Sequence, residues 1–178
     1  MADKPLRVGV IGTGVGAAVH IPGLRQIPEV EVVAIGASRI EHARQAALLH
    51  QVPHFFDDYR RMFREANLHA VTIATPPEFH HPIAIAAAEA GLHILCEKPM
   101  ARNAAEARDM HRLARDANVQ HAVDYKTRFL PSRQVCKRLI DQGYLGELQS
   151  VSLTVFRQSW RDRLRHSTSS LDAGERAG

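Results

Sequence analysis

Cysteine is scarce in this sequence, with only Cys96 and Cys136 among 178 residues. Two cysteines are too few for a framework of disulfides, and their separation along the chain differs from the paired spacing of a zinc site. We therefore expect both to be reduced thiols buried inside the protein.

Long hydrophobic runs are also missing. No apolar stretch is long enough to cross a membrane, and the first residues, Met1–Pro5, form no apolar signal segment. Hydrophobic residues make up 45% of the chain and charged residues 24%, which is ordinary for a globular protein. The sequence thus predicts a cytoplasmic protein without a membrane partner.

Motifs for nucleic-acid or metal binding are absent as well. The formal net charge of +4 is modest and most arginines are spread over predicted helices, so we expect no nucleic-acid partner. The 11 histidines include no H-E-x-x-H pattern. His80 and His81 are neighbours, and adjacent residues of a helix point in different directions, so we expect no metal site.

A glycine-rich turn near the N-terminus is the strongest pattern that is present. Residues 8–11 are mostly β-branched, which is typical of a strand covered on both faces. Gly12, Gly14 and Ala17 follow at the spacing G-x-G-x-x-G/A, ahead of a predicted helix. In this pattern Gly12 permits the tight turn, and Gly14 lets the backbone come close to a pyrophosphate. Ala17 lets the new helix pack against the sheet.

The start of that helix offers unpaired N–H groups and the positive end of a dipole, which suit phosphate groups. We therefore predict that a dinucleotide binds at this turn. The residues predicted to bind it here are Gly12, Thr13, Gly14, Val15, Gly16 and Ala17. A flavin or another adenine-containing ligand can use the same turn, and so can a purely structural bend. The motif alone therefore does not choose the cofactor.

The end of the second predicted strand, Val30–Ile35, bears on the choice between NAD and NADP. The NAD form of the motif has an acidic residue here that binds the ribose 2′-hydroxyl. Residues 36–39 contain no acid and instead offer the hydroxyl of Ser38 and the guanidinium of Arg39. Such donors suit a 2′-phosphate, which favours NADP, with NAD still possible. The alternative is that Ser38 only caps the next helix and Arg39 is solvated.

Strands and helices alternate along the rest of the chain. Further strands are expected at 70–74, 92–96 and 119–124, with a short extended piece at 52–55, and helices at 39–50, from 57, at 78–90 and from Asn103 to about 118. This order predicts the α/β class, a Rossmann-type doubly wound and mostly parallel sheet. Its ligand should lie at the carboxyl ends of the strands, which are Gly12–Ala17, Gly36–Arg39, Thr75–Pro76, Glu97–Pro99 and Asp124–Arg128.

Several spaced motifs resemble a known family. They are Val10–Gly14 with His20, Ile73–Pro76 with His80, Ala90–Pro99, Tyr125 with Arg128 and Phe129, Leu139–Ile140, and Gly143–Glu147. Over residues 6–156 the chain resembles the N-terminal part of the Gfo/Idh/MocA oxidoreductases, the glucose–fructose oxidoreductase and inositol dehydrogenase family. Motifs in this order are more specific than one glycine turn.

The resemblance implies roles around Glu97-Lys98-Pro99. Lys98 would assist proton transfer as the hydride moves, which suits a partly desolvated ammonium. Glu97 would help to hold Lys98 and the cofactor, and Pro99 would follow a cis bond, as is frequent in such proteins. The alternative is that Lys98 is only a solvated loop lysine. The further residues predicted to bind the cofactor are Ala74, Thr75, Pro76, His80, Glu97, Lys98 and Arg128.

The resemblance also implies a domain division and a reaction. We expect a dinucleotide-binding domain at 1–125 and the beginning of a truncated α+β domain at 126–178, with a first long strand at Val151–Phe156. The parent reaction would be hydride transfer between nicotinamide and a carbinol carbon of a sugar, cyclitol or related polyol. The chain alone would lack the substrate half, because a whole enzyme of this kind needs roughly 300 residues.

Two other functions stay open. The chain can be a non-catalytic dinucleotide-binding or sensor protein of the same fold. It can also be an association fragment, because the strand at Val151–Phe156 would have an unpaired edge that favours a homo-oligomer.

Overall fold

A computed structural model describes residues 4–154 of the chain. It contains one sheet of six strands in the order β3-β2-β1-β4-β5-β6, and every neighbouring pair is parallel. The strands are β1 Leu6–Ile11, β2 Val30–Gly36, β3 His54–Phe56, β4 Ala70–Ile73, β5 His93–Glu97 and β6 His121–Asp124. The predicted doubly wound sheet is confirmed, and the short extended piece is its edge strand β3.

Helices connect consecutive strands. A π-helical turn at Gly16–His20 continues into α1, and two short 3₁₀ turns stand at Pro77–Phe79 and Lys126–Phe129. The α-helices are α1 Ile21–Leu24, α2 Ile40–Leu49, α3 Tyr59–Glu65, α4 His80–Glu89, α5 Ala104–Asp116 and α6 Pro131–Asp141. Asn103 caps α5 as predicted, because its side chain accepts a hydrogen bond from the backbone N–H of Glu106 at 3.0 Å.

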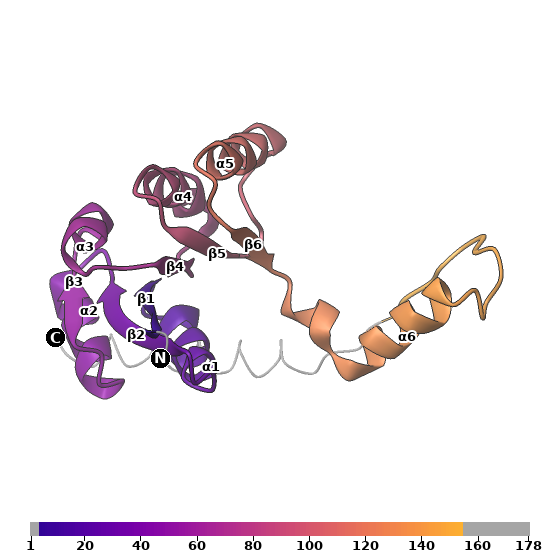
Figure 1. The fold of residues 1–178 in the computed structure, drawn as a ribbon, viewed down its shortest axis with the longest axis horizontal. Coiled ribbons are helices and arrows are strands. Elements are labelled where there is room, and N and C mark those ends of the chain that lie inside the picture. Colours follow the sequence, from indigo (N-terminus) through magenta and orange to yellow (C-terminus); the bar gives the residue numbers. More distant parts are fainter. Residues whose placement is uncertain (1–3, 155–178) are drawn as a thin grey trace, which may run out of the picture. The chain divides into compact units, whose positions relative to one another are not determined.

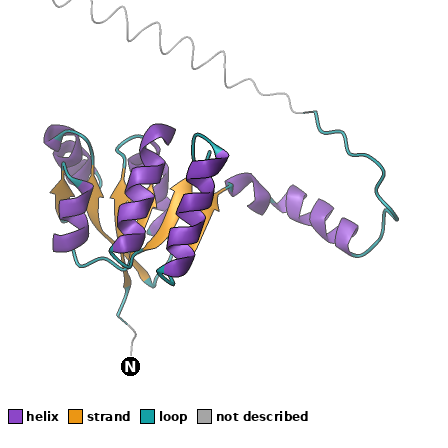
Figure 2. Cartoon of the chain, turned by 90° about the horizontal axis from the view of Figure 1, so that it is seen from above, coloured by secondary structure: helices purple, strands orange, loops and turns teal. Residues whose placement is uncertain are grey.

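The helices cover the two faces of the sheet, as Figure 1 shows. On one face α1 and α2 pack against the inward side chains of β1 and β2, including Val10 and Ile35. On the other face α3, α4 and α5 pack over Val71 and Ile73 of β4 and neighbouring strands. Figure 2 shows the chain from above, turned by 90° relative to Figure 1, with the helices lying over the strands. Burial of each such aliphatic side chain stabilises the fold by about 1.5–3 kcal/mol.

The direction of chain travel reverses at the centre of the sheet. From β1 the chain proceeds outward through β2 to β3, then returns to β4 on the other side of β1 and proceeds to β6. In doubly wound sheets the ligand lies outside the carboxyl ends of the strands at such a reversal. The carboxyl ends of β1 and β4 are therefore the place to look for a site.

The chain divides into two compact units, the first ending at Arg128 and the second beginning at Phe129. In the second unit, α6 starts with Pro131 in its first turn, where a missing N–H costs nothing. The strand predicted at 151–156 is not formed at 151–154, and residues 155 and 156 lie outside the described part. No described strand pairs with it, and an isolated strand cannot satisfy its backbone.

No helix within residues 4–154 has the length and apolar character needed to cross a membrane.

Candidate functional site

The glycine-rich turn fastens the ends of three strands together. Gly12 has a φ of +114°, and a Cβ there would stand 2.8 Å from the carbonyl carbon of Ala74. Its N–H donates to the carbonyl of Gly36 at 2.9 Å, and the N–H of Ala74 donates to the carbonyl of Ile11 at 2.8 Å. Only glycine combines this backbone conformation with so close an approach.

Beyond Gly12 the turn has one open side and one packed side. A Cβ at Gly14 would meet nothing within 4 Å, so a ligand can approach the backbone there. A Cβ at Gly16 would stand 2.9 Å from Cγ1 of Val10 and 3.3 Å from Cβ of Ala74. Close packing of helix against sheet was predicted for Ala17, which is buried. The structure shows that Gly16 needs this closeness too.

The end of β2 presents exposed donors. Ser38 and Arg39 are both exposed, and the Arg39 side chain has no partner among residues 4–154. The alternative that Ser38 caps α2 is wrong, because the N-cap is Arg39, in extended conformation and without a side-chain capping bond. Both side chains therefore remain available to a group placed outside β2.

The loop after β4 and the loop after β5 meet at His80. Its Nδ1 lies 2.9 Å from the carbonyl oxygen of Pro99, and its Nε2 lies 2.8 Å from that of Thr75. The ring is 1% exposed. The hydroxyl of Thr75 is buried and has no hydrogen-bond partner within the described part of the chain.

The segment Glu97-Lys98-Pro99 forms the end of β5 and the turn after it. The Lys98–Pro99 peptide bond is cis, which the family resemblance implied. The backbone N–H of Lys98 donates to Oε2 of Glu97 at 3.1 Å. Lys98 is exposed, as the alternative of a solvated loop lysine predicts for the chain without a ligand. It follows the last residue of the strand, and the described residues do not cover it.

Behind this segment lies a buried polar cluster that sequence reasoning did not assemble. Nε2 of His20 lies 3.4 Å from Oε1 of Glu97 and 3.6 Å from Oδ2 of Asp124. Nζ of Lys126 lies 3.7 Å from Oε1 of Glu97. Burial opposes the ionisation of Glu97. The hydrogen bonds from His20 and from the N–H of Lys98, with the charge of Lys126, outweigh it and lower the pKa of Glu97.

The donor atoms of His20, Glu97 and Asp124 lie within 4.8 Å of one another, a spacing that a metal ion can bridge. Lys126 already places a positive charge beside Glu97, so the cluster is balanced as an ion-pair network. The sequence shows only that Glu97 and Asp124 each stand at the end of a predicted strand, and the structure pairs these strands, β5 and β6, with Glu97 opposite Asp124. Arg128 follows in the 3₁₀ turn at Lys126–Phe129.

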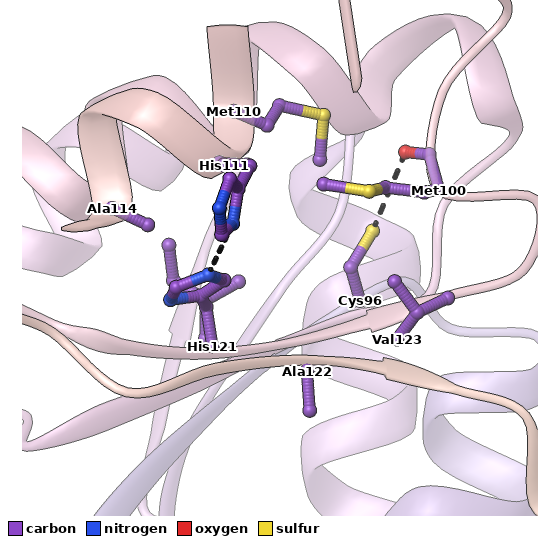
Figure 3. A pocket seen from close by; sticks show the side chains of 10 residues that line it. Cys96, Met100, Met110, His111, Ala114, His121, Ala122 and Val123 are labelled. Atoms are coloured by element: carbon purple, nitrogen blue, oxygen red, sulfur yellow. Dashed lines mark hydrogen bonds between the residues drawn. The ribbon is translucent and has the colours of Figure 1, made fainter. Parts of the chain in front are cut away.

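An apolar cavity of about 240 Å³ lies on the opposite side of β5. Figure 3 shows Cys96 pointing into it with Met100 and Met110. Side chains alternate along a strand, so Glu97 is directed to the other face, toward His20. Burial, and secondarily the charge of Glu97, raises the pKa of the Cys96 thiol to about 12. The cavity is therefore separate from the polar cluster and has no reactive thiolate.

One further expectation about side chains needs correction. Cys136 was expected to be buried but is exposed on α6, because the described residues place no neighbour over that side chain. His111 is exposed, and it also makes a polar contact. Its Nδ1 lies 2.9 Å from Nε2 of His121, and both residues line the cavity in Figure 3.

The glycine turn at the reversal of the sheet, open to a ligand at Gly14, defines a dinucleotide-binding domain of the doubly wound α/β class. Residues 6–125 match the Gfo/Idh/MocA oxidoreductase family with its NAD-binding Rossmann fold, and the chain belongs to this family.

Relatives of known name support this assignment. An uncharacterized oxidoreductase of Synechocystis sp. is 36% identical over 154 residues, covering 86% of this chain and 42% of that protein. Levoglucosan dehydrogenase of Pseudarthrobacter phenanthrenivorans is 34% identical over 163 residues, covering 87% and 42%. The solved structure of scyllo-inositol dehydrogenase from Lactobacillus casei, with bound NAD(H) and scyllo-inositol, has a TM-score of 0.75 at 26% identity, covering 81% and 43%. The chain spans less than half the length of these relatives.

Proposed function

We propose that this chain is the dinucleotide-binding part of an NAD(P)-dependent dehydrogenase acting on a carbinol carbon of a sugar, cyclitol or related polyol. The observation that carries the proposal is the turn at Gly12–Gly16, which closes against Ala74 and leaves Gly14 open. The polyol class rests on the names of the relatives, levoglucosan dehydrogenase and scyllo-inositol dehydrogenase.

The residues around this turn fit a dinucleotide. A helix begins at Gly16, and the first N–H groups of a helix lack intrahelical partners, which suits the pyrophosphate. On the β4 side, Thr75 has a buried hydroxyl without a hydrogen-bond partner among residues 4–154. Lys98 lies in the next loop, which His80 ties to that of Thr75.

The bound nicotinamide would supply the acceptor or donor of the hydride, and the protein would manage the proton. We assign Lys98 as the proton-transfer group: its neutral amine would take the proton from the substrate hydroxyl, and the resulting ammonium would return it in the reverse direction. The carboxylate of Glu97 accepts a hydrogen bond from the backbone N–H of Lys98 and so fixes the backbone there. His20 and Lys126 keep Glu97 ionised, so it accepts that bond as a carboxylate.

We further propose a preference for NADP, because Ser38 and Arg39 are exposed donors and residues 36–39 include no carboxylate. The test is thermal unfolding of the 178-residue chain with NADPH, NADH or neither. A ligand at 100 times its Kd stabilises by about 2.7 kcal/mol, which raises the Tm by roughly 5–10 °C. A larger shift with NADPH supports the preference, and a larger shift with NADH overturns it. No shift with either overturns the dinucleotide site.

Arg39→Glu tests the assigned residue. It should reduce the shift with NADPH and leave that with NADH nearly unchanged, because only NADPH carries the 2′-phosphate. Arg44→Glu is the matched control, since it makes the same charge change at an exposed position on the same helix. Equal effects of the two variants would reduce the role of Arg39 to general electrostatics.

Lys98→Ala separates proton transfer from cofactor binding. The exposed side chain should add little to dinucleotide affinity, so the variant should bind NADPH with a Kd within about twofold of the wild type, a free-energy change of about 0.4 kcal/mol. A much larger loss would place Lys98 among the groups that hold the cofactor instead.

A further inference from the structure

His80 makes two polar contacts from a fully buried position. Both ring nitrogens face backbone carbonyl oxygens, of Thr75 at 2.8 Å and of Pro99 at 2.9 Å. A carbonyl oxygen only accepts hydrogen bonds, so each bond that His80 makes here is donated by a ring N–H, of which the neutral ring has one and the imidazolium two. Hydrophobic packing alone would not aim both nitrogens at carbonyls, and the arrangement gives the ring a specific task.

The two carbonyls belong to loops that are otherwise separate. The ladder between β4 and β5 pairs residues as far as Ile73 with Cys96. Beyond it, no backbone hydrogen bond joins residues 75–76 to residues 98–99 within the described part of the chain. His80 therefore supplies the polar link between the loops from a position at the start of α4.

We propose that His80 is a positioning residue, which holds the loop of Thr75 and Pro76 at a fixed distance from the loop of Lys98 and Pro99. The proposal rests on the proposed function, because these loops would flank the nicotinamide end of the dinucleotide. Because His80 is 1% exposed, this positioning role takes the place of the direct cofactor contact that the sequence predicts for it. It fixes where the Thr75 hydroxyl and the Lys98 ammonium stand relative to each other, and so sets the nicotinamide half of the site without affecting the phosphate half at Gly12–Gly16.

We call the link that His80 makes between the two loops the clamp. It is tested without any ligand by amide hydrogen exchange on the full chain. His80→Phe keeps a ring but removes both ring nitrogens. It should accelerate exchange in residues 74–79 and 97–101 by about tenfold, the effect of losing about 1.4 kcal/mol of local protection. His81→Phe is the matched control, because His81 is the next residue and contacts Asp109 on α5 at 2.9 Å instead. Unchanged exchange in both loops of His80→Phe would overturn the clamp.

The consequence for the site is tested by comparing two ligands. NADPH spans both halves of the site, whereas 2′,5′-ADP reaches only the adenosine and phosphate part. His80→Phe should weaken NADPH by about tenfold and leave 2′,5′-ADP unchanged. An equal loss for both ligands would show a general structural role and overturn the proposal. If the wild type binds neither these ligands nor NADH, the proposed function fails, and the exchange experiment alone decides the clamp.

His80→Gln keeps the experiment decisive should His80→Phe not fold. The amide nitrogen of glutamine can donate to one of the two carbonyls, so one loop stays tied. Exchange should then accelerate in one loop only, and the loss of NADPH affinity should be smaller than for a variant without donors. Acceleration in neither loop would overturn the clamp.

Discussion

Nε2 of His20, in the turn of helix after β1, lies 3.4 Å from Oε1 of Glu97 at the end of β5. The two residues are separated by 77 positions in the sequence, and both are buried. The sheet brings them together because β1 and β5 flank β4 and end at the same edge. The family motif around Glu97 is thus supported from behind by a residue of the glycine-rich turn region.

Glu97→Gln should destabilise the fold by about 2 kcal/mol, because it removes a charged acceptor from a buried network. The effect should depend on pH. Glu97 has a lowered pKa in the folded protein, so its carboxylate adds stability above the unfolded pKa of about 4.3 and loses it as the pH falls through the folded value. Urea unfolding at pH 7 and at pH 3.5 measures both quantities.

The difference between wild type and Glu97→Gln should therefore shrink at the lower pH. Glu106 and Asp109 also have lowered pKa values, from Arg102 and His81 respectively, so both proteins keep some acid sensitivity. Glu65→Gln serves as the control, because Glu65 forms an exposed pair with Arg61 on one helix. A destabilisation as small as that of the control would show that the buried cluster contributes no more than a surface pair.

Gly12→Ala and Gly14→Ala should separate folding from binding. Gly12→Ala forces a side chain into a positive φ and against the carbonyl of Ala74, which should cost about 3 kcal/mol. Gly14→Ala meets nothing within 4 Å, so its stability should stay within about 0.5 kcal/mol of the wild type. Chemical unfolding without ligand gives both values.

Although Gly14→Ala should be stable, it should bind NADPH poorly. A methyl group at Gly14 occupies the open side of the turn, where the backbone is proposed to meet the pyrophosphate, so the Tm shift with NADPH should largely disappear. A full shift in Gly14→Ala would move the phosphates away from this residue.

Local patterns were sufficient to predict the fold. Alternating β-branched runs and helices with caps such as Asn103 gave the parallel sheet, and the glycine spacing at Gly12 gave the turn after β1. These features depend on residues near one another in the sequence. For the same reason the strand predicted from residue 151 is not formed at 151–154, since an alternating pattern says nothing about whether a partner strand lies beside it.

Local sequence patterns could not predict the buried polar cluster around Glu97. His20, Glu97 and Asp124 come from three separate segments, and only the order of strands in the sheet places them together. The two contacts of His80 depend on the path of two loops, which no periodicity encodes. The exposure of Lys98 depends on what covers the end of β5, and residue type at one position cannot reveal that.

Asn103→Ala should lower stability by about 1 kcal/mol. Its side chain accepts the N–H of Glu106 in the first turn of α5, and loss of such a cap typically has this cost. Asn103→Asp keeps an acceptor oxygen and is the matched control, expected to retain most of the stability in thermal unfolding. If alanine and aspartate behave alike, the cap contributes nothing measurable and α5 is held by packing of Met110 and Ala114.

The two thiols should differ sharply in reactivity. Cys136 is exposed, whereas Cys96 is 2% exposed, and burial raises the pKa of the Cys96 thiol to about 12. An aromatic disulfide reagent at pH 8 should therefore label one thiol quickly, and Cys136→Ser should abolish that fast phase. Labelling of Cys96 should follow only unfolding, because both the thiolate and access are lacking in the folded state. Raising the pH to 9.5 should not make Cys96 reactive in the folded protein, since the thiol stays protonated below its raised pKa. Fast labelling of Cys136→Ser in the folded protein would mean that the cavity beside Met110 admits the reagent and that Cys96 ionises more readily than its burial implies.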